Sequence, residues 1–132
     1  MAENKETIVI ADDDPLNRHS MSGFAEVTFP NYHHLFCEDT QTLEALLKKS
    51  RDISLVITGL NMRGEMSERV IATYSPRVPF VLCTGDHEEG ERIRDSYKIA
   101  YLPKPFDLKD FKHATRTVLL IYALREATES SQ

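Results

Sequence analysis

Short apolar runs alternate with helical patterns five times along this chain of 132 residues. The runs are Thr7–Ala11 (TIVIA), His33–Cys37, Leu55–Thr58 (LVIT), Phe80–Cys83 (FVLC) and Ala100–Leu102. Most are continuously apolar instead of alternating with polar residues, which is typical of strands buried on both faces. Strands joined through helices run parallel, with helices covering both faces of the sheet. The pattern therefore predicts an α/β fold: a doubly wound, five-stranded parallel sheet with five helices.

Polar residues mark where each predicted helix begins. The predicted helices cover about 15–26, 40–49, 67–74, 87–97 and 108–127, and the best capping residues are Asp14, Asp39 (or Thr40), Asp86 and Asp107. Pro15 fits the first position of a helix, because a missing N–H costs nothing there. Glu89, three residues after Asp86, resembles the second half of a capping box. Only Thr128–Gln132 reads as a tail.

The length predicts one domain over residues 1–132, with its core at about 7–124. The net charge of −5 argues against nucleic acid or an anionic membrane as the main partner. Cys37 and Cys83 lie in apolar surroundings and are expected to be buried and reduced. The start, MAENKET, is not a signal peptide, and Val118–Leu124 is too short to span a bilayer, so we expect a cytoplasmic protein.

Five scattered residues are predicted to meet at one edge of the sheet. Asp12 and Asp13 follow the first strand, Gly59 and Thr84 end the third and fourth, and Lys104 follows the fifth. In doubly wound sheets the carboxyl ends of the strands lie together, and ligands bind just outside them. The sequence therefore predicts a single pocket with two carboxylates, a hydroxyl and an ammonium group.

Four segments resemble a response-regulator receiver domain, the family of the bacterial chemotaxis regulator: IVIADDDPLN, LVITGLNM, VLCTG and YLPKPF. The resemblance covers Thr7 to about Leu124 and implies a flavodoxin-like sheet of strand order 2-1-3-4-5. In that family two acidic residues and an acceptor aspartate hold Mg²⁺, and the aspartate takes a phosphoryl group from a histidine kinase. The resemblance also implies a cis bond between Lys104 and Pro105.

Carried over by position, the resemblance assigns a role to several residues of this chain. Asp12 and Asp13 match the acidic pair, Asn61 the backbone carbonyl of the metal shell, Thr84 the hydroxyl, Tyr101 the aromatic and Lys104 the lysine. Gly59 stands where the family has its phosphoacceptor, and Arg63 stands where it usually has a proline. The stretch from Gly59 to Thr84 is also short, which predicts a trimmed third helix.

Glycine at position 59 removes the chemistry of the family. An acyl phosphate needs a carboxylate nucleophile, which glycine lacks. Thr58 points to the opposite face of its strand, and the Asn61 amide is a poor nucleophile. Mg²⁺ also loses a ligand, so we expect no cofactor and at most weak Mg²⁺ binding. Without a third carboxylate, Lys104 is expected to pair with Asp12 or Asp13.

The sequence thus predicts a pseudo-receiver: a signalling module, not an enzyme, that acts by phosphorylation-independent protein–protein interaction. The alternative is a conventional phosphoacceptor receiver domain of a two-component system carrying an inactivating substitution at Gly59. A phosphate-ester hydrolase using Asp12 and Asp13 is disfavoured, because no nucleophile or second anchored base accompanies them. We expect the partner to bind the face formed by the fourth helix, the fifth strand and the last helix.

The last predicted helix carries apolar residues on two faces. At 100° per residue the stripe toward the sheet comprises Ala114, Thr115, Val118, Ile121 and Tyr122, with Arg125 at its end. Leu120 and Leu124 fall almost opposite, where a surface helix is normally polar. They predict an interface with a protein partner or, in a homodimer, with a second copy.

The histidines are weaker candidates for metal sites. His33 and His34 are neighbours on a predicted strand, so their side chains point to opposite faces. The acids in His87-Glu88-Glu89 fit the first turn of a helix for electrostatic reasons alone. We therefore expect packing or surface roles for these histidines.

Overall fold

The computed structural model describes residues 6–130. Residues 1–5, most of the segment judged not to be a signal peptide, and residues 131–132 of the predicted tail lie outside that range. The main sheet is parallel, with the order β2-β1-β3-β6-β7. Its strands are β1 (Thr7–Ala11), β2 (His33–Cys37), β3 (Ile53–Gly59), β6 (Phe80–Thr84) and β7 (Ala100–Pro103). This order confirms the predicted α/β, flavodoxin-like sheet 2-1-3-4-5.

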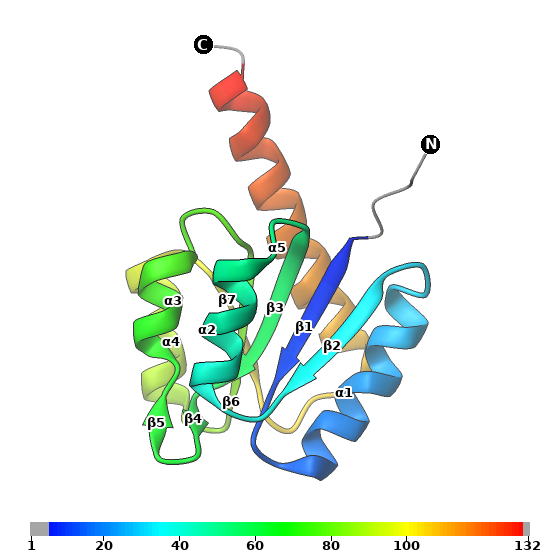
Figure 1. Cartoon of the computed structure of the whole chain (residues 1–132), viewed down its shortest axis with the longest axis vertical. Coiled ribbons are helices and arrows are strands. Elements are labelled where there is room, and N and C mark those ends of the chain that lie inside the picture. Colours follow the sequence, from blue (N-terminus) through cyan, green and yellow to red (C-terminus); the bar gives the residue numbers. More distant parts are fainter. Residues whose placement is uncertain (1–5, 131–132) are drawn as a thin grey trace.

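Five helices cover the two faces of the sheet (Figure 1). They are α1 (Pro15–Thr28), α2 (Thr40–Lys49), α3 (Glu68–Tyr74), α4 (His87–Tyr97) and α5 (Leu108–Ser130). Helices α1 and α5 contribute buried residues to one face, and α2, α3 and α4 contribute to the other. The seven residues of α3 agree with the predicted shortening of the third helix.

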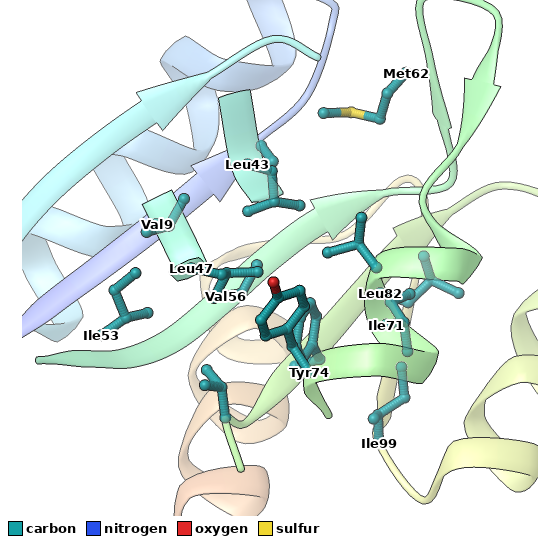
Figure 2. Close-up of a cluster of buried hydrophobic side chains, with 14 of the residues drawn as sticks. Val9, Leu43, Leu47, Ile53, Val56, Met62, Ile71, Tyr74, Leu82 and Ile99 are labelled. Carbon is teal, nitrogen blue, oxygen red and sulfur yellow. The ribbon is translucent and has the colours of Figure 1, made fainter. Parts of the chain in front are cut away.

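Side chains that alternate along each strand divide the core into two layers. In β1, Val9 belongs to the layer beneath α2, α3 and α4, whereas Ile8 and Ile10 belong to the layer beneath α1 and α5. Figure 2 shows the first of these layers, in which Leu43 and Leu47 of α2 meet the sheet. Because both layers are apolar, the strands read as continuous apolar runs in the sequence.

The predicted caps are present. The carboxylates of Asp14, Asp39 and Asp86 accept hydrogen bonds from the backbone N–H groups of Leu16, Thr42 and Glu89, respectively. The capping box predicted at Asp86 is only half formed, because the Asp86 N–H donates to Thr84 Oγ1 and not to the Glu89 side chain. A reciprocal pair of bonds does form at the start of α5, where Asp107 and Asp110 each accept from the other's N–H.

A two-stranded hairpin between β3 and α3 was not predicted. It consists of β4 (Asn61–Met62) and β5 (Glu65–Met66), joined by Arg63 and Gly64. Both turn residues have positive φ, 53° and 84°. Two-residue hairpin turns of this kind need positive φ at both central positions, which glycine adopts at no cost and arginine rarely does. Two strands of two residues are too short to show a period in the sequence.

Helix α5 corrects two expectations. It continues through Ser130, so Thr128–Ser130 belong to the helix and not to a tail. Ile121 was expected to face the sheet but is 43% exposed, whereas Val118 and Tyr122 are buried. The reason is visible in Figure 1: the C-terminal part of α5 extends beyond the sheet and the other helices, which leaves one side of it uncovered.

Leu120 and Leu124 are 60% and 59% exposed, as predicted. Among residues 6–130 no helix combines the length and the apolar character needed to cross a membrane.

Both cysteines are buried and free, as predicted. Burial is the main cause that raises the pKa of each thiol to about 12, so neither is a reactive thiolate at neutral pH.

Candidate functional site

The carboxyl ends of the parallel strands bring together Asp12, Gly59, Thr84 and Lys104, as the topology requires. Asp12 is buried, and its Oδ2 lies 3.0 Å from Lys104 Nζ. This contact confirms the predicted ion pair and selects Asp12 over Asp13. The Lys104–Pro105 bond is cis, as the resemblance implied.

Both carboxylate oxygens of Asp12 are already engaged. Oδ2 accepts from Lys104, and Oδ1 accepts the N–H of Asp14 at 2.9 Å. A buried carboxylate is stable only when it is paired and hydrogen-bonded, and here the chain itself supplies both partners.

Gly59 ends β3 directly beside Asp12. A Cβ at this position would lie 3.3 Å from Asp12 Oδ2, so any side chain here would point at that carboxylate. The Gly59 carbonyl accepts hydrogen bonds from Ser67 Oγ at 2.7 Å and from Thr58 Oγ1 at 2.9 Å. The backbone is therefore fixed in place, but the position offers no group that could take up a phosphoryl group.

Thr84 and Tyr101 lie on the β6–β7 side of the pocket. Thr84 Oγ1 accepts the N–H of Asp86, which orders the start of α4. The ring of Tyr101 packs on Gly90 of α4, where a Cβ would come within 2.4 Å of the ring, so only glycine fits. The Tyr101 hydroxyl is 2.8 Å from His87 Nδ1. Burial, followed by the charges of Glu91 and Asp86, raises the pKa of Tyr101.

Arg18, Arg63 and Glu38 form a cluster next to Asp12 and Asp13 at the mouth of the pocket. Asp13 Oδ2 accepts the N–H of Arg63 at 3.2 Å, and the Arg63 guanidinium lies 2.8 Å from Glu38. Arg18 Nη1 donates to the carbonyl of Asp12 at 2.6 Å, and Arg18 Nη2 lies 3.5 Å from the same Glu38.

Sequence reasoning missed Arg18 and Glu38. A signal for Glu38 was available, because it directly follows the second strand and therefore lies at the same edge as Asp12. No sequence signal pointed to Arg18, which lies within the first turn of α1 and reaches back to the strand end.

These residues do not fit a Mg²⁺ site of the family's kind. Mg²⁺ requires near-octahedral oxygen ligands, but both Asp12 oxygens and one Asp13 oxygen already accept hydrogen bonds from the chain. Position 59 adds no carboxylate. Asn61, whose carbonyl was assigned to the metal shell, lies in the β4–β5 hairpin, where it pairs with Met66. Within residues 6–130 no group of three or more His, Cys, Asp or Glu side chains is arranged to hold a metal ion.

Open grooves flank α5, away from this pocket. One, of about 800 Å³, runs along the outer face of α5 and is lined by Leu108, Lys109, Lys112, His113, Arg116 and Leu120, among others. A second, of about 520 Å³, lies between α5 and β7 and includes Tyr101 and Pro103. The half-buried ring of Tyr101 therefore borders both the pocket side, where it contacts α4, and the groove between β7 and α5.

No family model and no curated protein matches this sequence. Solved structures do match its fold. A signal receiver domain of an HD domain-containing protein from Pseudomonas fluorescens is 22% identical with a TM-score of 0.78, over 96% of each chain. A response regulator receiver domain from Clostridium thermocellum is 17% identical with a TM-score of 0.77, over 90% of this chain and 98% of that one.

The chemotaxis response regulator CheY4 of Vibrio cholerae is 16% identical with a TM-score of 0.74, over 87% of this chain and 99% of its own. Identities this low establish the fold alone. The chain has the fold of response-regulator receiver domains.

Proposed function

We propose that this protein is a pseudo-receiver, a signalling module that binds a protein partner without being phosphorylated. The observation that carries the proposal is the pair formed by Gly59 and the Lys104–Asp12 contact. The scaffold of a phosphate-accepting pocket is present, its acceptor is missing, and its lysine already holds a carboxylate of the chain. A module of this kind is not an enzyme, needs no cofactor and works in the cytoplasm.

The test is an NMR titration with Mg²⁺ and then beryllofluoride, run beside a Gly59→Asp variant. Beryllofluoride would imitate a phosphoryl group here on an acceptor carboxylate at position 59, which the native protein lacks. The native protein is therefore expected to show no saturable shifts at Thr84, Tyr101 and Lys104. Intact-mass spectrometry after incubation with acetyl phosphate is expected to find no phosphoryl adduct on the native protein. An adduct, or saturable shifts around Lys104, would refute the proposal.

The same titration separates the proposal from its alternative, a conventional receiver silenced by one substitution. If position 59 is the only change, then Gly59→Asp alone restores binding of Mg²⁺ and beryllofluoride. If the whole β3–α3 segment has diverged, as the β4–β5 hairpin and Arg63 suggest, then the single change is insufficient.

We further propose that the partner binds the face formed by α4, β7 and α5, and that Leu120 and Leu124 belong to the contact. Both leucines are exposed on the side of α5 that faces away from the sheet, and Leu120 borders the groove along that helix. Exposed apolar side chains that gather on one face commonly mark an interface. The partner is a signalling protein or, in a homodimer, a second copy of this chain.

A double variant, Leu120→Ser with Leu124→Ser, tests this surface. Val27→Ser in α1 is the matched control, because Val27 is also 59% exposed but lies on another helix. Sedimentation velocity over a concentration series is expected to show self-association that the double variant abolishes and the control retains. If the native protein remains monomeric at every concentration, the homodimer is excluded, and a different signalling protein remains as the proposed partner. Partner binding that is unaffected by the double variant would refute the surface itself.

A further inference from the structure

The mouth of the pocket carries an arrangement that the missing acceptor does not explain. Arg18 and Arg63 approach it from α1 and from the β4–β5 hairpin, and both contact Glu38. We propose that these two arginines permanently take the place of a divalent cation at this pocket. As a consequence, an aspartate restored at position 59 does not by itself restore Mg²⁺ binding. This inference rests on the proposed function, since it explains how the pocket is stable without metal or phosphate.

The hairpin turn holds Arg63 in its place. Arg63 and Gly64 form a two-residue turn with φ of 53° and 84°. In this conformation the Arg63 N–H bonds to Asp13 Oδ2 while its side chain reaches Glu38 on the loop after β2. Met62, next to the turn, is buried in the core beneath α2, α3 and α4, which anchors the hairpin (Figure 2).

Arg18 acts from the other side of the pocket. It lies one turn after Asp14, the residue that caps α1, and its Nη1 donates to the Asp12 carbonyl at 2.6 Å. Its second terminal nitrogen lies 3.5 Å from Glu38. Glu38 therefore bridges the two guanidinium groups and keeps both beside the acidic residues that follow β1.

The acidic side chains at the pocket already have partners within the chain. Lys104 pairs with Asp12, both guanidinium groups lie beside Glu38, and the Arg63 N–H bonds to Asp13. A divalent cation entering here would meet two guanidinium charges, and it would compete with Lys104 for Asp12 and with the Arg63 N–H for Asp13. Coulomb repulsion and the loss of these bonds both oppose its binding.

The experiment is a Mg²⁺ titration followed by NMR amide shifts on Gly59→Asp, Arg63→Gly and the double variant, beside the native protein. Glycine keeps positive φ accessible at position 63 and keeps the backbone N–H, while it removes the side chain with its guanidinium. The control is Gly59→Asp with Arg69→Ala, which removes the same charge from α3, where Arg69 contacts Glu44 and Glu65.

We expect no saturable binding by the native protein and only weak binding by Gly59→Asp or by the control. The double variant is expected to bind Mg²⁺ at least about ten-fold more tightly than Gly59→Asp, in the range typical of changes around metal ligands. Gly59→Asp with Arg63→Asn repeats the test if the glycine variant fails to fold, because asparagine also tolerates positive φ.

Two results would overturn the inference. The first is that Gly59→Asp alone binds Mg²⁺ within two-fold of the double variant, in which case the arginines do not compete with the metal. The second is that both double variants with a changed residue 63 fold and still fail to bind Mg²⁺. The first result would also favour the alternative, a conventional receiver silenced at position 59, whereas the second leaves the proposed function standing. The absence of phosphorylation fails separately, if the native protein itself takes up a phosphoryl group or beryllofluoride.

Discussion

The two sides of the pocket are built in different ways. On the β6–β7 side, Thr84 and Tyr101 lie on neighbouring strands, and Lys104, which follows β7, pairs with the buried Asp12. On the β3–α3 side, Gly59 carries no side chain, the β4–β5 hairpin precedes α3, and Arg63 contacts Asp13 and Glu38. The charged contact on the first side is a largely buried ion pair, beside a closely packed aromatic ring, whereas the ion pairs on the second side lie at the surface.

This difference shows where the stability of the pocket resides. Removing one partner of a buried ion pair leaves an uncompensated charge and is costly, whereas exposed pairs contribute little and are screened by salt. Arg69 and Arg92, which hold the β5–α3 segment to α2 and α4, are both exposed. We therefore expect changes at Lys104 to cost far more than changes in the segment that follows Gly59.

The largest effect is expected for Lys104→Met, which keeps the length of the side chain but removes its charge. Asp12 would remain buried without its cation, and the free energy of unfolding is expected to fall by about 3 kcal/mol. Urea unfolding at pH 7 measures this loss. Lys109→Met, on the exposed surface of α5, is the control and should change stability by less than about 0.5 kcal/mol. Equal losses for the two variants would contradict the comparison.

A smaller effect is expected for Gly90→Ala in α4. The added Cβ would lie 2.4 Å from the Tyr101 ring and must displace it. Overpacking of this kind costs about 1–3 kcal/mol, of which the better helix propensity of alanine offsets about 1 kcal/mol. Thermal unfolding is the measurement, and the NMR signals of His87 should shift as the contact with the Tyr101 hydroxyl is lost.

Two controls sharpen this prediction. A Cβ added at Gly23 in α1 would meet nothing within 4 Å, so Gly23→Ala is expected to raise stability by about 0.5–1 kcal/mol. In a Tyr101→Ala background, Gly90→Ala should no longer destabilise the protein. A loss of stability that persists in that background would show that the tyrosine ring is not what the glycine accommodates.

The smallest effect concerns the surface ion pairs that hold α3. Hydrogen bonds from Arg92 and Tyr97 lower the pKa of Glu68 below its ordinary value of 4.5. The stability contributed by Glu68 is therefore present above that value and is lost as the pH falls through the lowered pKa. Glu68→Gln should cost less than about 1 kcal/mol at pH 7, and the difference should shrink toward pH 3. Urea unfolding at several pH values measures it; a difference that grows on acidification would reverse the assigned sign.

The helix starts and the strands could be predicted from the sequence, because the residues that determine each of them lie within a few positions of one another. Asp14 with Pro15 predicted the start of α1, and Asp39 the start of α2. The five parallel strands followed from short apolar runs and the rules of parallel sheets, whereas their order was implied by the resemblance to receiver domains. The burial of residues near the end of α5 was predicted less well. Ile121 has the spacing of a core residue, but it lies where the helix has passed beyond the sheet.

The sequence by itself determined the fold class, the edge at which the pocket forms, and the lack of a nucleophile at position 59. Only the tertiary structure decided that Lys104 pairs with Asp12, which lies 92 residues away in the chain. It also decided that Arg18, Glu38 and Arg63 form one cluster, and that the Tyr101 ring packs on Gly90, where no side chain would fit. The physical reason is that caps and strands follow from neighbouring residues, whereas ion pairs and ring contacts depend on how distant segments pack together.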